Sequence, residues 1–240
     1  MEHQGLHPNT QPSLPSVRNE VDKTRDRHYI EIKDYKPGRE GGAEMKRSLL
    51  TGFVVFLLSI PMLASGVTYQ IDPDHSNFQF KVRHMTVSNV RGEFKKAKGI
   101  VSIDENDLTG LKVEVTLDAA SLNTDQAKRD DHLKGEDFFD VAKYPTITFV
   151  SKKVIKVDEN RLKVIGDLTI HGVTREVTVE VEGPTPEVKD PGGNIRRGAT
   201  GTLRINRKDF GMVWHKTLDN GGMVVGDDVN ISVEVELVRK

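Results

Sequence analysis

The sequence contains no cysteine and only one tryptophan among its 240 residues. Without cysteine, disulfide frameworks, thiolate zinc sites, iron–sulfur clusters and cysteine nucleophiles are all excluded. A charge surplus of either sign is also absent, because 35 Lys and Arg stand against 36 Asp and Glu. Nucleic-acid-binding proteins normally carry a basic surplus that meets the phosphates. We therefore expect no nucleic-acid partner.

A stretch that begins at Met45 has the layout of a secretory signal peptide. Two positive charges follow Met45, then an uncharged run over residues 48–63, and then three small residues that end at Gly66. The apolar part is shorter than the about 20 residues that a membrane-spanning helix needs. An uncleaved N-terminal anchor is the alternative. We predict a signal peptide over residues 45–66, with cleavage near Gly66, and a secreted mature chain of residues 67–240.

Residues 1–44 precede this signal and differ from it in composition. They hold seven Lys and Arg, eight Asp and Glu and four of the ten prolines, with little apolar periodicity. Such a stretch buries too little apolar surface to offset its chain entropy, so we predict that it is disordered. Because a signal peptide normally begins a protein, the simplest hypothesis is that Met45 is the true start.

Residues 67–240 alternate apolar and polar side chains with a period of two, which is typical of half-buried β-strands. Turn-forming residues separate the alternating segments. Only Ser121 to Tyr144 has a helical pattern, with Ser121 or Asn123 as the expected N-cap. The regular segments are Asn77–His84, Leu111–Asp118, Leu162–Ile170, Thr174–Glu182 and Val229–Leu237, and less regular ones lie around Gly99–Ile103, Thr146–Val157 and Arg197–Asn206.

This pattern predicts an all-β fold of about eight antiparallel strands with one short helical segment. Because each strand has one apolar face, the sheet must curl on itself or pair with a second sheet. A closed barrel and a sandwich both satisfy that requirement. An eight-stranded barrel is about wide enough to be filled by side chains or to hold one small ligand.

The sequence has none of the motifs of several catalytic classes. It contains no G-x-S-x-G elbow, no H-E-x-x-H, no Walker loop and no G-x-G-x-x-G. The histidines of the predicted barrel are scattered, and no pair has the i,i+4 spacing of ligands on one helix face; they are His75, His84, His132, His171 and His215. We expect these side chains to form capping and turn hydrogen bonds, and we predict no metal site.

Three polar residues are candidates to hold the polar end of a ligand. His84 ends an apolar strand face, so it can place a polar tip at the mouth or floor of an apolar cavity; a hydrogen-bonded, half-buried histidine is the alternative. Arg129 and His132 share a helix side by their i,i+3 spacing, with Asp130 turned away. The Arg129 guanidinium can bind a phosphate or carboxylate, or these charges can tie the helix to the barrel rim.

The aromatic residues of this region are either ordinary core or the wall of a lipid tunnel. A ligand-lined wall and a packed core use the same residue types, so the residues themselves leave both interpretations open. The set is Phe78, Phe80, Phe94, Phe138, Phe139, Phe149, Phe210 and Trp214.

Four blocks, in this order and spacing, resemble the YceI family of bacterial periplasmic, lipocalin-like proteins. They lie within Tyr69–Met85, Ser121–Phe149, Gly166–Thr174 and Ile205–Met212. The resemblance covers nearly all of residues 68–240. It implies a periplasmic location and an extended eight-stranded antiparallel barrel around a long apolar tunnel. It also implies binding of a polyisoprenoid, an isoprenoid pyrophosphate, a quinone or another long amphiphile.

Carried onto this sequence, the resemblance implies a wall and a closed end. The implied wall comprises Phe78, Phe80, Val82, Phe94, Phe149, Phe210 and Trp214, and the segment with Arg129, His132, Phe138 and Phe139 closes or gates one end. His84, Arg129 and His132 are the candidates for fixing the polar head. Ala199 stands where family members often carry an aromatic residue, which leaves the local width of the tunnel open.

The resemblance brings no catalytic set, so we predict a lipid-binding protein that is not an enzyme and has no cofactor besides the bound lipid. One alternative is an enzyme acting on an amphiphilic or isoprenoid substrate through Asp130, His132 or His171. A second alternative is a stress-related interaction module whose barrel is simply packed. Transient membrane contact and a homodimer are left open.

Overall fold

The computed structural model of the protein describes residues 66–219 and 221–240. The predicted disordered leader, the start at Met45 and all of the signal peptide up to Ser65 lie outside the described residues. Within the described ranges, no helix is both long enough and apolar enough to cross a membrane.

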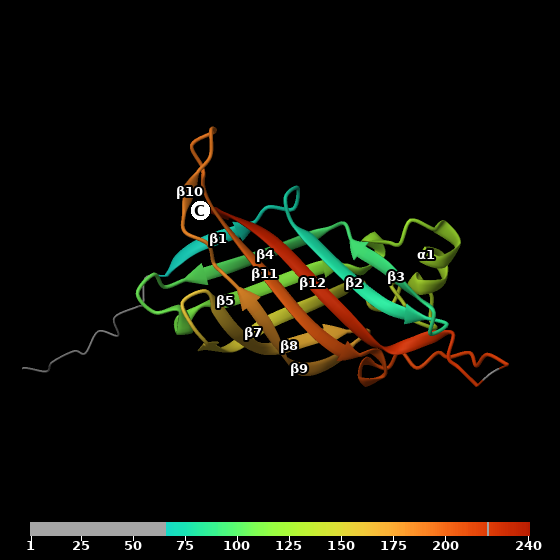
Figure 1. The fold of residues 1–240 in the computed structure, drawn as a ribbon. Helices are drawn as coiled ribbons and strands as arrows, with labels where there is room; N and C mark the ends of the chain where they lie inside the picture. Colours follow the sequence, from blue (N-terminus) through green and yellow to red (C-terminus); the bar gives the residue numbers. More distant parts are fainter. Residues whose placement is uncertain (1–65, 220) are drawn as a thin grey trace, which may run out of the picture. The chain divides into compact units, whose positions relative to one another are not determined.

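The described chain folds into one antiparallel sheet with a single α-helix (Figure 1). Three short 3-10 turns interrupt the strands, at Leu108–Gly110, Ala119–Ser121 and Arg207–Phe210, and α1 spans Ala127–Lys134. The strands are β1 (Val67–Ile71), β2 (Asn77–His84), β3 (Ser88–Phe94), β4 (Ala97–Ile103), β5 (Lys112–Asp118), β6 (Leu122–Asn123), β7 (Thr146–Lys156), β8 (Arg161–Ile170), β9 (Val173–Glu182), β10 (Val188–Lys189), β11 (Ile195–Asn206) and β12 (Val225–Arg239).

Eight of these strands close into a barrel. Their order is β11-β9-β8-β7-β5-β4-β1-β12, and β12 pairs again with β11 from Arg196↔Val238 to Asn206↔Asp228. Closure pairs β11 and β12 with each other over this length, so neither strand is left as the open edge of the sheet on that side. The predicted all-β, eight-stranded antiparallel barrel is confirmed, and the sandwich alternative is wrong.

The long strand β12 divides its second edge between two partners. Its last residues pair with β1, whereas residues 225–234 pair with β2. Strand β2 in turn carries β3, and β3 carries the short β6. Figure 1 shows α1 at this extended end of the barrel, beside β3, and β10 at the opposite end. The two ends of the barrel are therefore built from different elements.

Period-two alternation places the apolar side chains inside the barrel. In β8, Leu162, Val164, Gly166, Leu168 and Ile170 are buried, while the residues that alternate with them are exposed or only partly buried. Gly166 continues the inward face, and an added Cβ there would lie 2.4 Å from the backbone oxygen of Val150. A glycine is needed at this position because two backbones approach closely.

The expected helix over Ser121 to Tyr144 is much shorter in the structure. Residues 119–123 form a 3-10 turn and β6, because Asp118 caps the turn and β6 pairs with β3. The helix begins only after Gln126, whose side chain accepts a hydrogen bond from Arg129 N. The expectation of an N-cap at Ser121 or Asn123 is therefore wrong. Tertiary pairing decides the backbone here, over local propensity.

Candidate functional site

An apolar cavity of about 260 Å³ lies inside the barrel. One water molecule needs only about 10–15 Å³ of such space, so the cavity is on the order of twenty times larger. Its lining extends from Pro184, next to β10, to Phe138, next to α1. Apart from Gln79, Thr148 and Arg207, the lining residues are apolar or glycine. A cavity lined in this way favours an apolar ligand over water.

Several inward-facing residues remain only partly buried. Val113 and Val115 of β5 and Val233 and Val235 of β12 line the cavity, yet none of them is fully buried. In a solid protein core such side chains interdigitate with few voids larger than a water molecule. The barrel interior is therefore not packed solid along its length. A long molecule can complete this packing by taking the place of the missing side chains.

Seven of the apolar residues expected at the site line the cavity. Phe94 lies at the centre of an aromatic group, with its ring centroid 6.0 Å from that of Phe80 and 5.5 Å from that of Phe139. The seven are Phe78, Phe80, Val82, Phe94, Phe138, Phe139 and Phe149. Contact of these side chains with a bound lipid stays a prediction.

Phe210 and Trp214 lie outside the cavity lining, which differs from the expected wall. Phe210 is buried in the core beside Ile170 and Met212. The Trp214 ring packs at 5.3 Å from the rings of both His132 and Phe138. Both residues follow the end of β11 at Asn206, where the alternation of a strand no longer decides which side chains face inward.

The helix charges hold the neighbouring loop. Arg129 donates from Nε to Thr124 Oγ1 at 2.7 Å and from Nη2 to Thr124 O at 2.6 Å. Asp130 is buried, and its carboxylate accepts from Thr124 N at 2.9 Å and from Thr124 Oγ1. The expectation that Asp130 turns away from the side of Arg129 is therefore wrong. Both side chains come from the first turn of α1, and both bind Thr124, which precedes the helix. This geometry favours the rim-tying alternative for Arg129.

The two histidine candidates also lie outside the cavity lining. His132 is exposed, and its Nε2 lies 3.0 Å from Asp137 Oδ2. His84 ends β2 as a half-buried residue, opposite Ser88 and Val225 in the sheet. The structure thus brings seven apolar candidates together around the cavity and leaves the three polar candidates outside its lining, although the His132 ring lies 5.2 Å from that of Phe138. A role for the polar three in holding a head group stays a prediction.

One buried cation at the α1 end was missed by the sequence analysis. Arg207 lines the cavity and is 3% exposed. Its Nε and Nη2 donate at 3.0 Å to Gly226 O and Asp227 Oδ1, and its Nη1 donates to Met212 O. Burial lowers the pKa of Arg207, and the Asp227 carboxylate opposes that shift. Its place directly after an apolar strand face is the signal that could have identified it.

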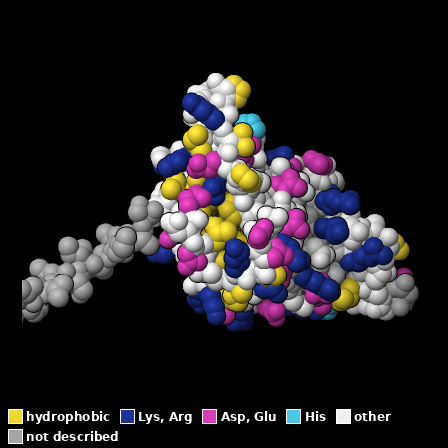
Figure 2. Space-filling view, turned by 60° about the vertical axis from the view of Figure 1, so that its left-hand side comes forward, with side chains coloured by type: hydrophobic (Ala, Val, Ile, Leu, Met, Phe, Trp, Pro, Cys, Tyr) yellow, Lys and Arg dark blue, Asp and Glu magenta, His cyan; other side chains and the backbone are white. Residues whose placement is uncertain are grey.

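A second missed group lies at the β10 end of the barrel, beyond the residues that line the cavity. This charged cap comprises Tyr69, Glu105, Glu187, Arg197 and Arg239. Tyr69 is fully buried and donates from its hydroxyl to Glu187 at 2.5 Å; burial and this carboxylate raise the pKa of Tyr69 to about 12. The Arg197 guanidinium lies 5.7 Å from the Tyr69 ring centroid and donates to Glu105 at 2.8 Å. Figure 2, turned toward this side, shows hydrophobic side chains among acidic and basic ones.

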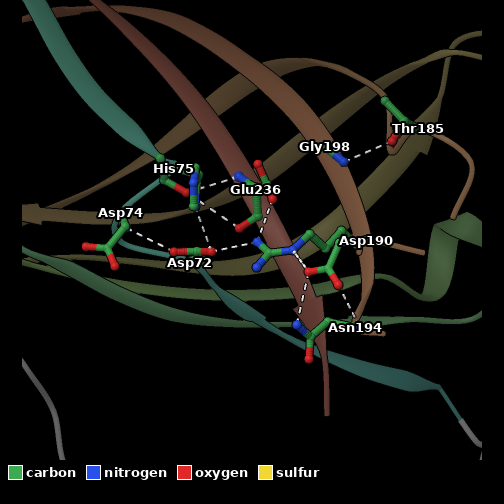
Figure 3. A network of polar contacts seen from close by, with 10 residues as sticks. Asp72, Asp74, His75, Thr185, Asp190, Asn194, Gly198 and Glu236 are labelled. Carbon is green, nitrogen blue, oxygen red and sulfur yellow. Dashed lines mark hydrogen bonds and ion pairs between the residues drawn. The ribbon is translucent and has the colours of Figure 1, made fainter. Parts of the chain in front are cut away.

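A surface network near β10 has the donor set of a metal site. Ligand atoms of Asp72, His75 and Glu236 lie within 4.8 Å of one another (Figure 3). Arg196, however, already donates to Asp72 at 2.6 Å, to Glu236 at 2.5 Å and to Asp190 at 2.6 Å. One guanidinium thus occupies carboxylate oxygens that would ligate a cation and offsets part of their negative charge. The network ties the β1–β2 turn to β12 and to the β10–β11 hairpin.

Comparisons with known proteins agree with this architecture. Residues 69–237 match the model of a family described as the YceI-like domain. A UPF0312 protein of Vibrio vulnificus is 36% identical over 168 residues, covering 69% of this chain and 88% of the relative. The structure of BcnA from Burkholderia cenocepacia has a TM-score of 0.60 at 26% identity, over 69% of this chain and 98% of that one.

A third similar structure shares the fold at lower identity. It is a domain from Saccharophagus degradans described as polyisoprenoid-binding, with a TM-score of 0.54 and 17% identity. The match covers 72% of this chain and 99% of that domain. Likeness at this level of identity bears on the fold alone.

Proposed function

This chain belongs to the YceI-like domain family, and on that premise we propose that it binds one long isoprenoid lipid inside the barrel. The observation that carries the proposal is the apolar cavity of about 260 Å³, lined from the Pro184 end to the Phe138 end. Each methylene group that leaves water for such a wall contributes roughly 0.8 kcal/mol, before the cost of ordering the chain. Affinity would therefore grow with the length of chain buried.

The isoprenoid nature of the ligand rests on family resemblance, and the geometry supports a long apolar chain more generally. The Saccharophagus domain described as polyisoprenoid-binding has the same fold, which is consistent with the proposal. The predicted ligands, a polyisoprenoid, an isoprenoid pyrophosphate and a quinone, share a long branched chain and differ in their polar head. The protein would sequester or carry such a lipid without forming a covalent bond.

The arrangement of the polar residues favours binding over catalysis. Asp130 is engaged with Thr124, and His132 lies beside Asp137. His171 Nδ1 lies 3.3 Å from Phe210 O. None of these three candidates for acid–base chemistry lines the cavity. A general acid or base must come within hydrogen-bond reach of the reacting group, and this condition is not met for a ligand in the cavity.

We place this function in the periplasm, after export by the signal peptide predicted at residues 45–66. Loading or release of a lipid would then involve transient contact with a membrane. N-terminal sequencing of the exported protein tests this part, with cleavage near Gly66 as the expected result. A mature chain that still contains residue 30 would contradict it.

Lipid extraction tests the ligand. The protein is purified from the periplasm of its native bacterium without detergent, extracted with organic solvent, and the extract is analysed by mass spectrometry. We expect one isoprenoid lipid, near one molecule per chain. A periplasmic protein of similar size, purified in parallel, controls for lipid carried along by chance. Several preparations with no lipid above that control would refute the proposal.

A further inference from the structure

Arg197 of the charged cap lies on the inward face of β11. Along this strand Ala199, Gly201 and Leu203 all line the cavity, and period-two alternation puts Arg197 on the same face. Its partner across the β11–β12 ladder is Leu237, which also lines the cavity. The Arg197 side chain is only 10% exposed. Arg197 itself is not among the lining residues, and its cation is held one inward position beyond Ala199, which lines the cavity.

The Nε atom of this arginine is buried and has no hydrogen-bond partner. Among the described residues it is the one buried side-chain nitrogen or oxygen in this condition. An unpaired donor in the interior is costly, and native proteins rarely leave one without a partner. Arg207 at the other end differs, since its Nε, Nη1 and Nη2 each donate a hydrogen bond within the protein. Every nitrogen of the Arg207 guanidinium thus has a partner, whereas one buried nitrogen of Arg197 has none.

The charges of the cap are already balanced. Arg197 donates to Glu105, and Arg239 lies 3.4 Å from Glu187. The Tyr69 hydroxyl stays protonated and donates to Glu187. An incoming anion would add uncompensated negative charge unless it displaced one of these carboxylates. An uncharged oxygen can accept from Nε without disturbing the balance.

We propose that the charged cap is a head-group subsite, in which Arg197 Nε donates to an uncharged oxygen acceptor of the lipid, such as a carbonyl. The apolar chain then extends through the cavity toward α1. This inference rests on the proposed function and adds two things to it: the chemical class of the head and the direction of the bound chain. The direction is opposite to the one implied by head-group candidates near α1.

The test measures how tightly three probes with different head groups bind to the wild type and to two variants. The probes are hexadecane, methyl palmitate and hexadecyl phosphate, each competing against a fluorescent polyene fatty acid. Arg197→Lys keeps a cation opposite Glu105 but removes Nε. The control is Arg204→Lys, on the same strand, where the arginine is 65% exposed and pairs with Asp228. We expect the wild type and the control to prefer methyl palmitate over hexadecane by about tenfold, as one charge-assisted hydrogen bond allows.

Arg197→Lys is expected to lose this preference while its affinity for hexadecane is unchanged, which also shows that the variant is folded. An infrared measurement on wild-type protein adds an independent readout: the carbonyl band of bound methyl palmitate should shift to lower frequency. No shift and no preference for the ester would overturn the subsite. Strongest binding of hexadecyl phosphate would overturn the uncharged class. If the wild type binds none of the probes, the proposed function itself fails.

Discussion

Arg196 and Arg197 are adjacent in β11 and have opposite surroundings. Arg196 lies outside the barrel and donates to Asp72, Asp190 and Glu236. Arg197 lies inside, donates to Glu105 and keeps one buried nitrogen unpaired. Because successive side chains of a strand point to opposite faces, two like charges in sequence can serve an outer network and an inner cavity. At the scale of single residues, the face of the strand on which a charged side chain lies therefore decides which partners it has.

The outer network predicts a dependence of stability on pH. The Arg196 guanidinium, and then His75, lower the pKa of Asp72 from 3.8 to about 2. A group whose folded-state pKa is depressed stabilises the protein above its unfolded pKa and loses that contribution as the pH falls through the folded pKa. Asp72→Asn should therefore lower the free energy of unfolding at neutral pH by about 1–3 kcal/mol, a difference that shrinks between about pH 4 and pH 2.

Urea unfolding of wild type and Asp72→Asn at several pH values measures this difference. Asp74→Asn is the matched control, because Asp74 is an exposed neighbour in the same turn. A loss in Asp72→Asn that is as large at pH 2 as at pH 7 would show that the network acts through packing and not through charge.

Single-residue placement was predictable wherever a strand was regular. The alternation of β2 predicts that Phe78, Phe80 and Val82 share a face, and all three line the cavity. The inward place of Arg197 was not predictable in this way, because a charged residue on an apolar face looks like a break in the pattern. Phe210 and Trp214 follow the strand end, where neighbouring elements and not periodicity decide the direction of a side chain.

At the scale of elements, α1 depends on its anchors. An isolated helix of eight residues is unstable in water, because helix nucleation is costly and few hydrogen bonds follow it. Here two side chains of the first turn bind Thr124, which follows β6 directly. The helix, whose Leu133 lines the cavity, is thereby linked to the sheet through one loop residue.

Asp130→Ala should loosen this end of the barrel. The change leaves the buried Thr124 N–H without its acceptor, so we expect a loss of about 1–3 kcal/mol in the free energy of unfolding. Amide hydrogen exchange should rise in residues 124–134 more than in β8 or β9. Asp131→Ala is the control, since Asp131 is the exposed neighbour on the same helix. Equal effects of the two substitutions would contradict a specific anchoring role for Asp130.

Element prediction succeeded for long strands and failed for short ones. The alternating segments that correspond to β2, β5, β8, β9 and β12 match the observed strands closely. β3 has few apolar residues, and β6 and β10 have two residues each, so their extended backbone depends on pairing with a neighbour. The same pairing shortens the expected helix. Pairing with a strand that is distant in the sequence cannot be recognised from local periodicity.

At the scale of the whole molecule, the strand pattern alone was compatible with either a closed barrel or a sandwich. The choice lies in the pairing of β11 with β12 and of β12 with β1, the latter between strands at the two ends of the described chain. Sequence blocks resembling a known family supplied that information. With no cysteine available, ring closure and apolar burial hold the wall together around an interior that its own side chains do not fill.

A larger side chain inside the barrel should reduce ligand binding. Ala199 lines the cavity, and Ala199→Phe would place a ring where the ligand chain runs. If the ring displaces roughly two methylene groups of the chain, hexadecane should bind about tenfold more weakly. Thr202→Phe is the control, because Thr202 is exposed on the outer face of the same strand. Unchanged affinity in Ala199→Phe would mean that the chain does not pass this point.

A hollow barrel should also gain stability when it is loaded. A ligand that binds only the folded state raises the free energy of unfolding by about 2.7 kcal/mol at a free concentration one hundred times its Kd. Thermal unfolding of delipidated protein, with and without hexadecane, should therefore show a rise in Tm that grows with the logarithm of ligand concentration. Ala199→Phe should start from a partly filled interior and rise less at equal concentration. A Tm that is insensitive to ligand in both proteins would mean that the cavity is not where the chain binds, since a ligand in the core cannot favour the folded state without raising its stability.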